Sequence, residues 1–254
     1  MVDPTDVLLA DIVANPDDDV PRLIYADWLD DMGGPVERAR AEHIRLQVML
    51  ARMSEDDENR PEREAQERRL RKRYERHWLG SLREHVHGWA FSRGFLTHLS
   101  LDAAKLLRLA DSLFARHPLT SLRLTAARDR MVLQRLAQLP QLQRLTSLDL
   151  SNNYLDRGDV EPLLLSPYLG GLQQLRFNDN PYGYDAVTAV AEAPELAGLT
   201  SLEMRRNNLT EATAVQLGDS PYLVRLTLLD LRGNTISEAG REQLRSLYGQ
   251  AVRF

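Results

Sequence analysis

One repeated sequence motif in the second half of the chain constrains the fold more than any other feature. Its four clear copies begin 27 residues apart, at Leu145, Leu172, Leu199 and Leu226. Counted from that first leucine (offset 0), apolar residues recur at offsets 3, 5 and 10, and asparagine stands at offset 8. A fixed period of this length predicts a solenoid, in which similar units stack on one another.

The spacing of the apolar side chains predicts one short β-strand in each copy. Side chains two positions apart lie on the same face of a strand, so offsets 3 and 5 (Leu148 and Leu150 in the first copy) should point into a core. One unit cannot bury this face alone, and consecutive units should therefore stack into a parallel sheet. An amide at offset 8 can satisfy backbone groups where the chain leaves the strand. We therefore interpret Asn153, Asn180, Asn207 and Asn234 as structural, and not as a binding site.

Atypical copies stand at both ends of the array. Weaker copies begin at Leu96 and Leu119, and both carry alanine where the others carry asparagine. They fit the irregular terminal repeats of a solenoid. Val252 and Phe254 alternate as a strand would, which predicts a short closing edge strand.

Segments of helical length with acidic residues near their start separate the expected strands. Acidic residues suit the positive end of a helix. A proline five residues before each of the four clear copies should stop the preceding helix: Pro140, Pro167, Pro194 and Pro221. This unit resembles the ribonuclease-inhibitor type of leucine-rich repeat. The resemblance implies an α/β fold, a curved solenoid with parallel strands on the concave side and helices on the convex side.

The composition excludes several classes of protein. The chain has 254 residues, of which 43% are hydrophobic, and a formal charge of -5, which argues mildly against a dedicated nucleic-acid binder. It has no cysteine, hence no disulfide framework and no thiolate chemistry. No apolar run could span a membrane, and the N-terminal sequence lacks the profile of a secretory signal, so we expect a cytoplasmic protein.

The first fifty residues predict three helices with clear boundaries. Asp3 and Pro4 should open the first helix, Pro21 should lie at the start of the second, and Pro35 should start the third. The glycine pair Gly33-Gly34 should end the second. We expect three parts in the chain: a helical module over residues 1–53, a charged linker helix and cap over 54–90, and the solenoid over 91–254.

The helical module resembles a known family in two runs, Pro21-Arg-Leu-Ile-Tyr-Ala-Asp-Trp-Leu-Asp-Asp-Met-Gly and Glu37-Arg-Ala-Arg-Ala-Glu-His-Ile-Arg-Leu-Gln. They look like the bacterial repeat-companion domain, a short module found beside repeat arrays. The chain departs from that pattern at Gly34, where Asp is common, and at His43, where an aromatic residue is common. The family has no assigned chemistry, so the resemblance implies a bacterial repeat protein and no catalytic residue.

A polar and aromatic motif within this module has two interpretations. Tyr25, Asp27, Trp28, Asp30 and Arg45 could form a recognition patch. Alternatively the aromatic rings belong to the core and the aspartates pair with arginines or lie in water. We favour the second interpretation, because motifs in small helical modules mostly encode packing.

Charged residues dominate residues 54–90, where Pro61 should start a long helix. The basic cluster over residues 68–76 could bind nucleic acid or another polyanion. However, Glu64 precedes Arg68 and Glu67 precedes Arg71 by four residues, a spacing that favours ion pairs on a solvated helix. Leu70, Tyr74, Trp78 and Leu82 should form a narrow apolar stripe on this helix.

No catalytic motif, phosphate loop or complete set of metal ligands is present, so we expect no enzyme, cofactor or metal site. Six histidines are the only candidate bases, and the pair His85 and His87 lacks a third ligand in the sequence. The better candidate is the face of the sheet at offsets 4 and 6 together with its rim, where a partner protein could bind. These residues are Arg123, Asp149, Arg176, Asn178, Glu203, Arg205, Asp230 and Arg232, together with Arg206 at offset 7, and Tyr154, Tyr182 and Tyr184 on the rim.

Charges of alternating sign on neighbouring strands could simply neutralise one another on this face. At its C-terminal end Arg205, Arg206 and Arg232 are expected to be less fully matched, and so to favour acidic groups on a partner. We expect a scaffold protein, monomeric by default, that binds another protein without catalysis. The alternative is nucleic-acid or polyanion binding through the basic helix 68–76 and these C-terminal arginines.

Overall fold

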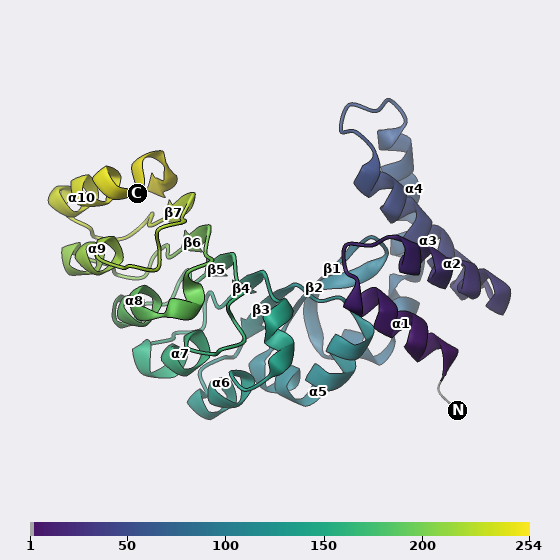
Figure 1. Ribbon diagram of the computed structural model, residues 1–254, viewed down its shortest axis with the longest axis horizontal. Helices are drawn as coiled ribbons and strands as arrows, with labels where there is room; N and C mark the ends of the chain where they lie inside the picture. Colours follow the sequence, from purple (N-terminus) through teal and green to yellow (C-terminus); the bar gives the residue numbers. More distant parts are fainter. Residues whose placement is uncertain (1–2) are drawn as a thin grey trace. The chain divides into compact units, whose positions relative to one another are not determined.

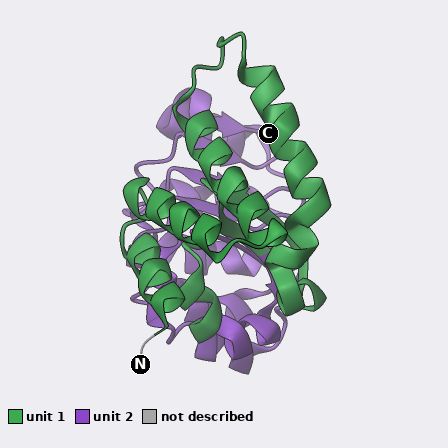
Figure 2. Ribbon diagram, turned by 90° about the vertical axis from the view of Figure 1, so that its right-hand side faces the viewer, with its two compact units in different colours: residues 1–99, 111–119 green, residues 100–110, 120–254 purple. Residues whose placement is uncertain are grey.

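The computed structural model describes residues 3–254 and divides into two compact units (Figure 2). Unit 1 comprises residues 1–99 and 111–119, and unit 2 comprises residues 100–110 and 120–254. The first two residues of the expected helical module lie outside the described residues. Within residues 3–254, no helix is long and apolar enough to cross a membrane.

Unit 1 begins with four helices, whose predicted starts are confirmed: α1 (Pro4–Ala14), α2 (Val20–Met32), α3 (Pro35–Arg52) and α4 (Arg60–Leu79) (Figure 1). The Asp3 side chain caps α1 by accepting a hydrogen bond from the backbone N–H of Thr5. Gly33 ends α2 with a left-handed φ of 77°. Pro61 lies in the first turn of α4, as predicted, but the helix ends at Leu79, so Leu82 falls in the following 3-10 helix η1 (Gly80–Glu84).

The polar and aromatic motif of α2 has the packing role favoured above. Leu29 is buried in the core of unit 1, and Tyr25 and Trp28 pack against that core. Asp27 and Asp30 both accept hydrogen bonds from Arg45, at 2.6 and 2.7 Å. The aspartates therefore hold α3 against α2.

A two-residue turn fixes strands β1 (Val86–Ser92) and β2 (Phe95–Asp102) against α3. Gly94 has φ of 84°, and a Cβ atom there would lie 2.5 Å from Cγ1 of Ile44. Its N–H donates a hydrogen bond to Oε1 of Gln47 at 2.8 Å. Only glycine fits position 94, because both the backbone conformation and the space exclude a side chain there.

Unit 2 alternates short strands with helices, as predicted. After α5 (Ala103–Arg116) come β3 (Ser121–Thr125), α6 (Arg130–Leu136), β4 (Ser147–Asp149), α7 (Arg157–Leu164), β5 (Gln174–Arg176), α8 (Gly183–Glu192), β6 (Ser201–Glu203), α9 (Glu211–Gly218), β7 (Leu228–Asp230), α10 (Glu238–Tyr248) and β8 (Val252–Arg253). Short 3-10 helices η2 (Pro140–Arg144), η3 (Pro194–Leu196) and η4 (Gly249–Ala251) lie before β4, β6 and β8. The order confirms the closing strand β8.

The strands form one sheet in chain order, β1 to β8, with parallel pairing from β3 to β8. Leu148 pairs with Leu175, Leu175 with Leu202, and Leu202 with Leu229, so the register from β4 to β7 advances by the sequence period of 27 residues. In Figure 1, helices α6 to α10 lie side by side along one face of the sheet. The residues at offsets 3 and 5 of the four clear copies are buried, which confirms the predicted core face.

Each of the four prolines follows the end of a helix by a few residues, and Pro140 and Pro194 begin 3-10 helices. The residue at offset 7 has a left-handed backbone in every copy from the second weak one onward: Ala126, Asn152, Asp179, Arg206 and Gly233. These turns carry the chain from each strand toward the next helix. The turn geometry therefore repeats even where the residue type does not.

The asparagines at offset 8 form the structural ladder that the sequence predicts. Oδ1 of Asn180 accepts hydrogen bonds from the backbone N–H groups of Asn153 and Leu155 in the preceding repeat. Its Nδ2 donates to the carbonyl oxygens of Leu150 and Phe177. The side chains of Asn153, Asn207 and Asn234 repeat this arrangement. Even Ala127 of the weak copy donates its N–H, to Asn153.

We expect Asn180→Ala to lower the free energy of unfolding by about 2 kcal/mol or more, because it leaves buried backbone groups without partners. Gln174→Ala, which removes an exposed amide from β5, is the matched control and should change it by less than about 0.5 kcal/mol. Urea denaturation of both variants measures the difference. Equal effects would contradict the role of the ladder.

A histidine in unit 1 should make stability depend on pH. Burial lowers the pKa of His117 to about 4, and its Nδ1 atom has no hydrogen-bond partner in the described part of the chain. An unfolded imidazole titrates near pH ~6.5, so between these values the unfolded chain binds more protons. Stability should therefore fall as the pH is lowered from about 6.5 to about 4.

We expect His117→Gln to lose less stability than the wild type between pH 6.5 and pH 4.5, measured by urea denaturation at both values. His77→Gln removes an exposed imidazole and serves as the control. A His117→Gln variant with the wild-type loss would show that this burial does not govern the acid response.

Candidate functional site

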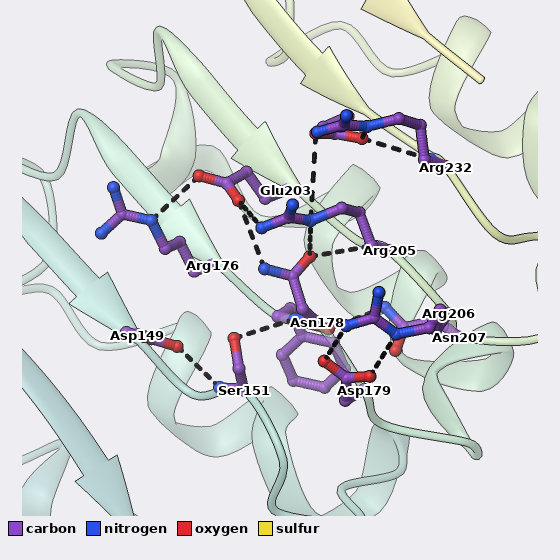
Figure 3. A network of polar contacts seen from close by, with 12 residues as sticks. Asp149, Ser151, Arg176, Asn178, Asp179, Glu203, Arg205, Arg206, Asn207 and Arg232 are labelled. Atoms are coloured by element: carbon purple, nitrogen blue, oxygen red, sulfur yellow. Dashed lines mark hydrogen bonds and ion pairs between the residues drawn. The ribbon is translucent and has the colours of Figure 1, made fainter.

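The strands bring the predicted site residues at offsets 4 and 6 together on the face of the sheet opposite the helices, called here the open face. Offset 4 places Arg123, Asp149, Arg176, Glu203 and Asp230 in one row, because these residues pair in register on β3 to β7. Offset 6 adds a second row beside it, since side chains two positions apart share a face. Figure 3 shows the central part of this network.

The row at offset 4 is only partly a chain of alternating ion pairs. Nε of Arg176 lies 2.9 Å from Oε1 of Glu203, and Nε of Arg123 lies 3.7 Å from Oδ2 of Asp149. Glu203 and Asp230, however, are neighbouring groups of like charge on β6 and β7. Such a pair would be unfavourable without cations close to both.

Arginines at offset 6 supply those cations. Nη2 of Arg205 lies 2.8 Å from Oε2 of Glu203, and its Nε lies 3.9 Å from Oδ2 of Asp230. Arg232 donates hydrogen bonds from Nε and Nη2 to the Asp230 carboxylate. The prediction that these C-terminal arginines are less fully matched is therefore wrong. It failed because an arginine in the turn after a strand is long enough to reach the carboxylate at the end of that strand, two positions earlier.

Arg206 is also matched, by a residue that the sequence analysis did not single out. Its Nε and Nη2 donate to the two carboxylate oxygens of Asp179, at 2.6 and 2.8 Å. These hydrogen bonds lower the pKa of Asp179. Both residues stand at offset 7, in consecutive repeats, with left-handed backbones. Their common offset was the signal in the sequence that could have revealed the pair.

Polar side chains at offset 6 continue the network between the strands. Oγ of Ser151 accepts a hydrogen bond from the backbone N–H of Asn178, and Oδ1 of Asn178 accepts one from the N–H of Arg205. Nδ2 of Asn178 donates to Glu203 at 3.3 Å. Asn178 is therefore buried within the network, and it is less accessible than the sequence suggested.

The carboxylates lie beneath the guanidinium groups. The Asp230 and Glu203 side chains are only 4% and 12% exposed, whereas those of Arg176 and Arg232 are 42% and 50% exposed. Burial raises the pKa of Asp230, but the hydrogen bonds from Arg232 together with the charges of Arg232 and Arg205 lower it overall. The solvent side of this face is consequently rich in oriented N–H donors.

The three predicted rim tyrosines are about half exposed, and they lie beyond the strands rather than on the open face. Tyr154 follows β4 and stacks beneath the guanidinium of Arg128, whose Cζ is 5.4 Å from the ring centre. Tyr182 is the N-cap residue of α8, with no hydrogen bond from its side chain to the helix, and Tyr184 lies in the first turn. The neighbouring Asp185 carboxylate raises the pKa of Tyr184.

His43 is buried in unit 1, with Nε2 3.0 Å from Oε1 of Glu67 and its ring against Trp78 and Phe91. Burial lowers the pKa of His43, and the bond to Glu67 opposes that effect. Within residues 3–254, no three histidine, aspartate or glutamate side chains are placed to hold a metal ion.

A family model for the leucine-rich repeat matches residues 144–166, which span β4 and α7. The match and the repeated strand and helix fit a leucine-rich repeat protein. No curated protein matches the chain. Repeats of this kind generally mediate protein–protein interactions and are generally not catalytic.

Substitutions of a buried and of an exposed aspartate in the network should differ in their effect on stability. Asp230→Asn weakens the bonds to Arg232 and Arg205 at a buried position, so we expect the free energy of unfolding to fall by about 1–2 kcal/mol. Asp179→Asn keeps a residue type that tolerates a left-handed backbone and weakens only an exposed ion pair, so little change is expected. Urea denaturation at low salt compares the two. A larger loss in Asp179→Asn would refute the assignment of the buried carboxylate as the anchor.

Proposed function

We propose that the chain is a non-catalytic protein-interaction module that binds a partner protein through the open face and rims of unit 2. In this proposal unit 2 is a curved solenoid of the ribonuclease-inhibitor type, and the open face is its concave side. The partner presents acidic groups to Arg123, Arg176, Arg205 and Arg232.

The state of Arg176 supports this proposal most directly. Only its Nε atom binds a carboxylate, and its two terminal nitrogens have no partner among the described residues. The hydrogen bond to Glu203 fixes the orientation of the Arg176 guanidinium. It leaves the terminal N–H groups of that guanidinium to bind a second carboxylate. A partner then meets an oriented donor, which reduces the entropy lost on binding.

The rim tyrosines supply the apolar contacts that the open face lacks. Tyrosine buries a large rigid surface with few rotatable bonds, and it is enriched among the residues that dominate binding energy. Tyr154, Tyr182 and Tyr184 expose between 46% and 51% of their surface. A partner that contacts both the open face and these rings would combine charge recognition with apolar anchoring.

For the rest of the chain we keep the interpretation drawn from its sequence. Residues 1–53 act as a helical module like the bacterial repeat-companion domain, residues 54–90 as linker and cap, and residues 91–254 as the solenoid. The protein then serves as a cytoplasmic scaffold. The alternative of polyanion binding through residues 68–76 and the C-terminal arginines is weaker, because Arg68 and Arg71 of the basic helix already pair with Glu64 and Glu67.

Affinity capture from the native host should identify the partner, with the full chain as bait. We expect one protein to be retained at about 150 mM salt after nuclease treatment, and its recovery to fall at least tenfold with Arg176→Ala/Arg232→Ala. The matched bait Arg225→Ala/Arg245→Ala removes the same charge from outside the open face and should retain it.

Two results would reject this function. Equal recovery on both double variants would show that the open face is not the binding surface. Recovery that disappears with nuclease treatment and falls steeply with salt would instead favour nucleic-acid binding.

A further inference from the structure

A groove in unit 1, separate from the residues of the proposed function, lies where α3 and α4 pack together. It has a volume of about 530 Å³, within the range of about 300–1,000 Å³ common for ligand sites. Its residues on α3 (35, 38, 39 and 42) and on α4 (66, 69, 70, 73 and 74) recur every three or four positions. Each set is therefore one helix face, about two turns long.

Three arginines give this α3–α4 groove an unbalanced positive charge. Arg38, Arg69 and Arg73 are exposed, and none forms an ion pair within the described residues. The only carboxylate in the lining is Glu42, whose Oε1 already accepts a hydrogen bond from Nε2 of Gln66 at 2.7 Å. The groove can thus accept anionic groups without first breaking an ion pair.

Apolar surface lies between these charges. Leu70 and Tyr74 are half-buried, and Ala39 is buried on the opposite helix. The guanidinium of Arg73 lies 5.3 Å from the ring centre of Tyr74, so one arginine is already held over the aromatic surface. A ligand that matches this lining needs an apolar side chain with acidic groups on either side of it.

The structure also divides the basic cluster of residues 68–76, which the sequence presents as one patch. Arg68 and Arg71 pair with Glu64 and Glu67, at 3.5 and 3.3 Å, and lie outside the groove. Only Arg69 and Arg73 of this cluster line the groove, where Arg38 of α3 joins them. The basic residues therefore do not form the continuous track that a nucleic-acid backbone requires.

We propose that the α3–α4 groove binds an acidic peptide segment of a partner protein. The segment carries one bulky apolar side chain, which packs against Leu70 and Tyr74, between carboxylates that bind Arg38, Arg69 and Arg73. Charge complementarity selects this occupant over a neutral or basic segment. Its short length, about two helical turns, suits a linear motif better than a folded domain.

An array of synthetic decapeptides tests this proposal with the full chain as the binding protein. The test peptides place Leu or Phe between pairs of Asp or Glu, and two matched sets replace the apolar residue by Ala or the acidic residues by Lys. We expect binding to the first set only. Arg69→Ala/Arg73→Ala should weaken it at least tenfold, whereas Arg68→Ala/Lys72→Ala, with the same loss of charge on the same helix outside the groove, should leave it unchanged.

Several outcomes would overturn the proposal. These are no binding to any acidic and apolar peptide, equal binding when Ala replaces the apolar residue, or equal weakening by the two double variants. Binding of single-stranded oligothymidylate with the same dependence on Arg69 and Arg73 would assign the groove to nucleic acid instead. Arg176→Ala/Arg232→Ala should bind the peptides as the wild type does, so failure here is distinguishable from failure of the open face.

Discussion

The fold of unit 2 depends on a set of buried amides more than on its strands. Strands β4 to β7 are each three residues long, so sheet hydrogen bonds alone connect little of each repeat. The asparagine of one repeat satisfies the backbone of the repeat before it, as Asn153 does for Ala127 and Asn180 for Asn153. Each repeat therefore needs the asparagine of the repeat that follows it, and its own asparagine serves the repeat before. This explains why the weak copy at Leu119 can dispense with asparagine and still join the stack.

The period in the sequence was sufficient to predict the register, the core face and the asparagine ladder, because all three depend on positions that recur every 27 residues. The partners of the long side chains could not be predicted in the same way. Arg205 stands two positions from Glu203, but only the folded strand decides that its guanidinium turns toward Glu203 and Asp230. Likewise, Glu67 looks like a solvated helix residue beside Arg71, whereas it is buried against His43, 24 positions earlier.

Net charge was a poor guide to the surfaces of this chain. The formal charge is -5, yet the open face and the α3–α4 groove both present guanidinium groups to solvent. On the open face the carboxylates are present in similar number but lie underneath, so counting residues misses the difference in depth. In the α3–α4 groove the acidic residues of α4, such as Glu64 and Glu67, lie outside the lining. The positions of the charged side chains therefore determine the charge of each surface more than the net charge of the chain does.

The carboxylates beneath the arginines also determine how affinity on the open face would accumulate. Each guanidinium already has one carboxylate acceptor, so an acidic group of a partner would be the second. Its contribution to the binding free energy would be smaller than that from an arginine without an ion pair. No single contact can then dominate, and tight association requires several acids spaced at the distance between strands, about 4.8 Å. In the proposed function, the open face would therefore discriminate between partners by the spacing of their acidic groups more than by the number of those groups.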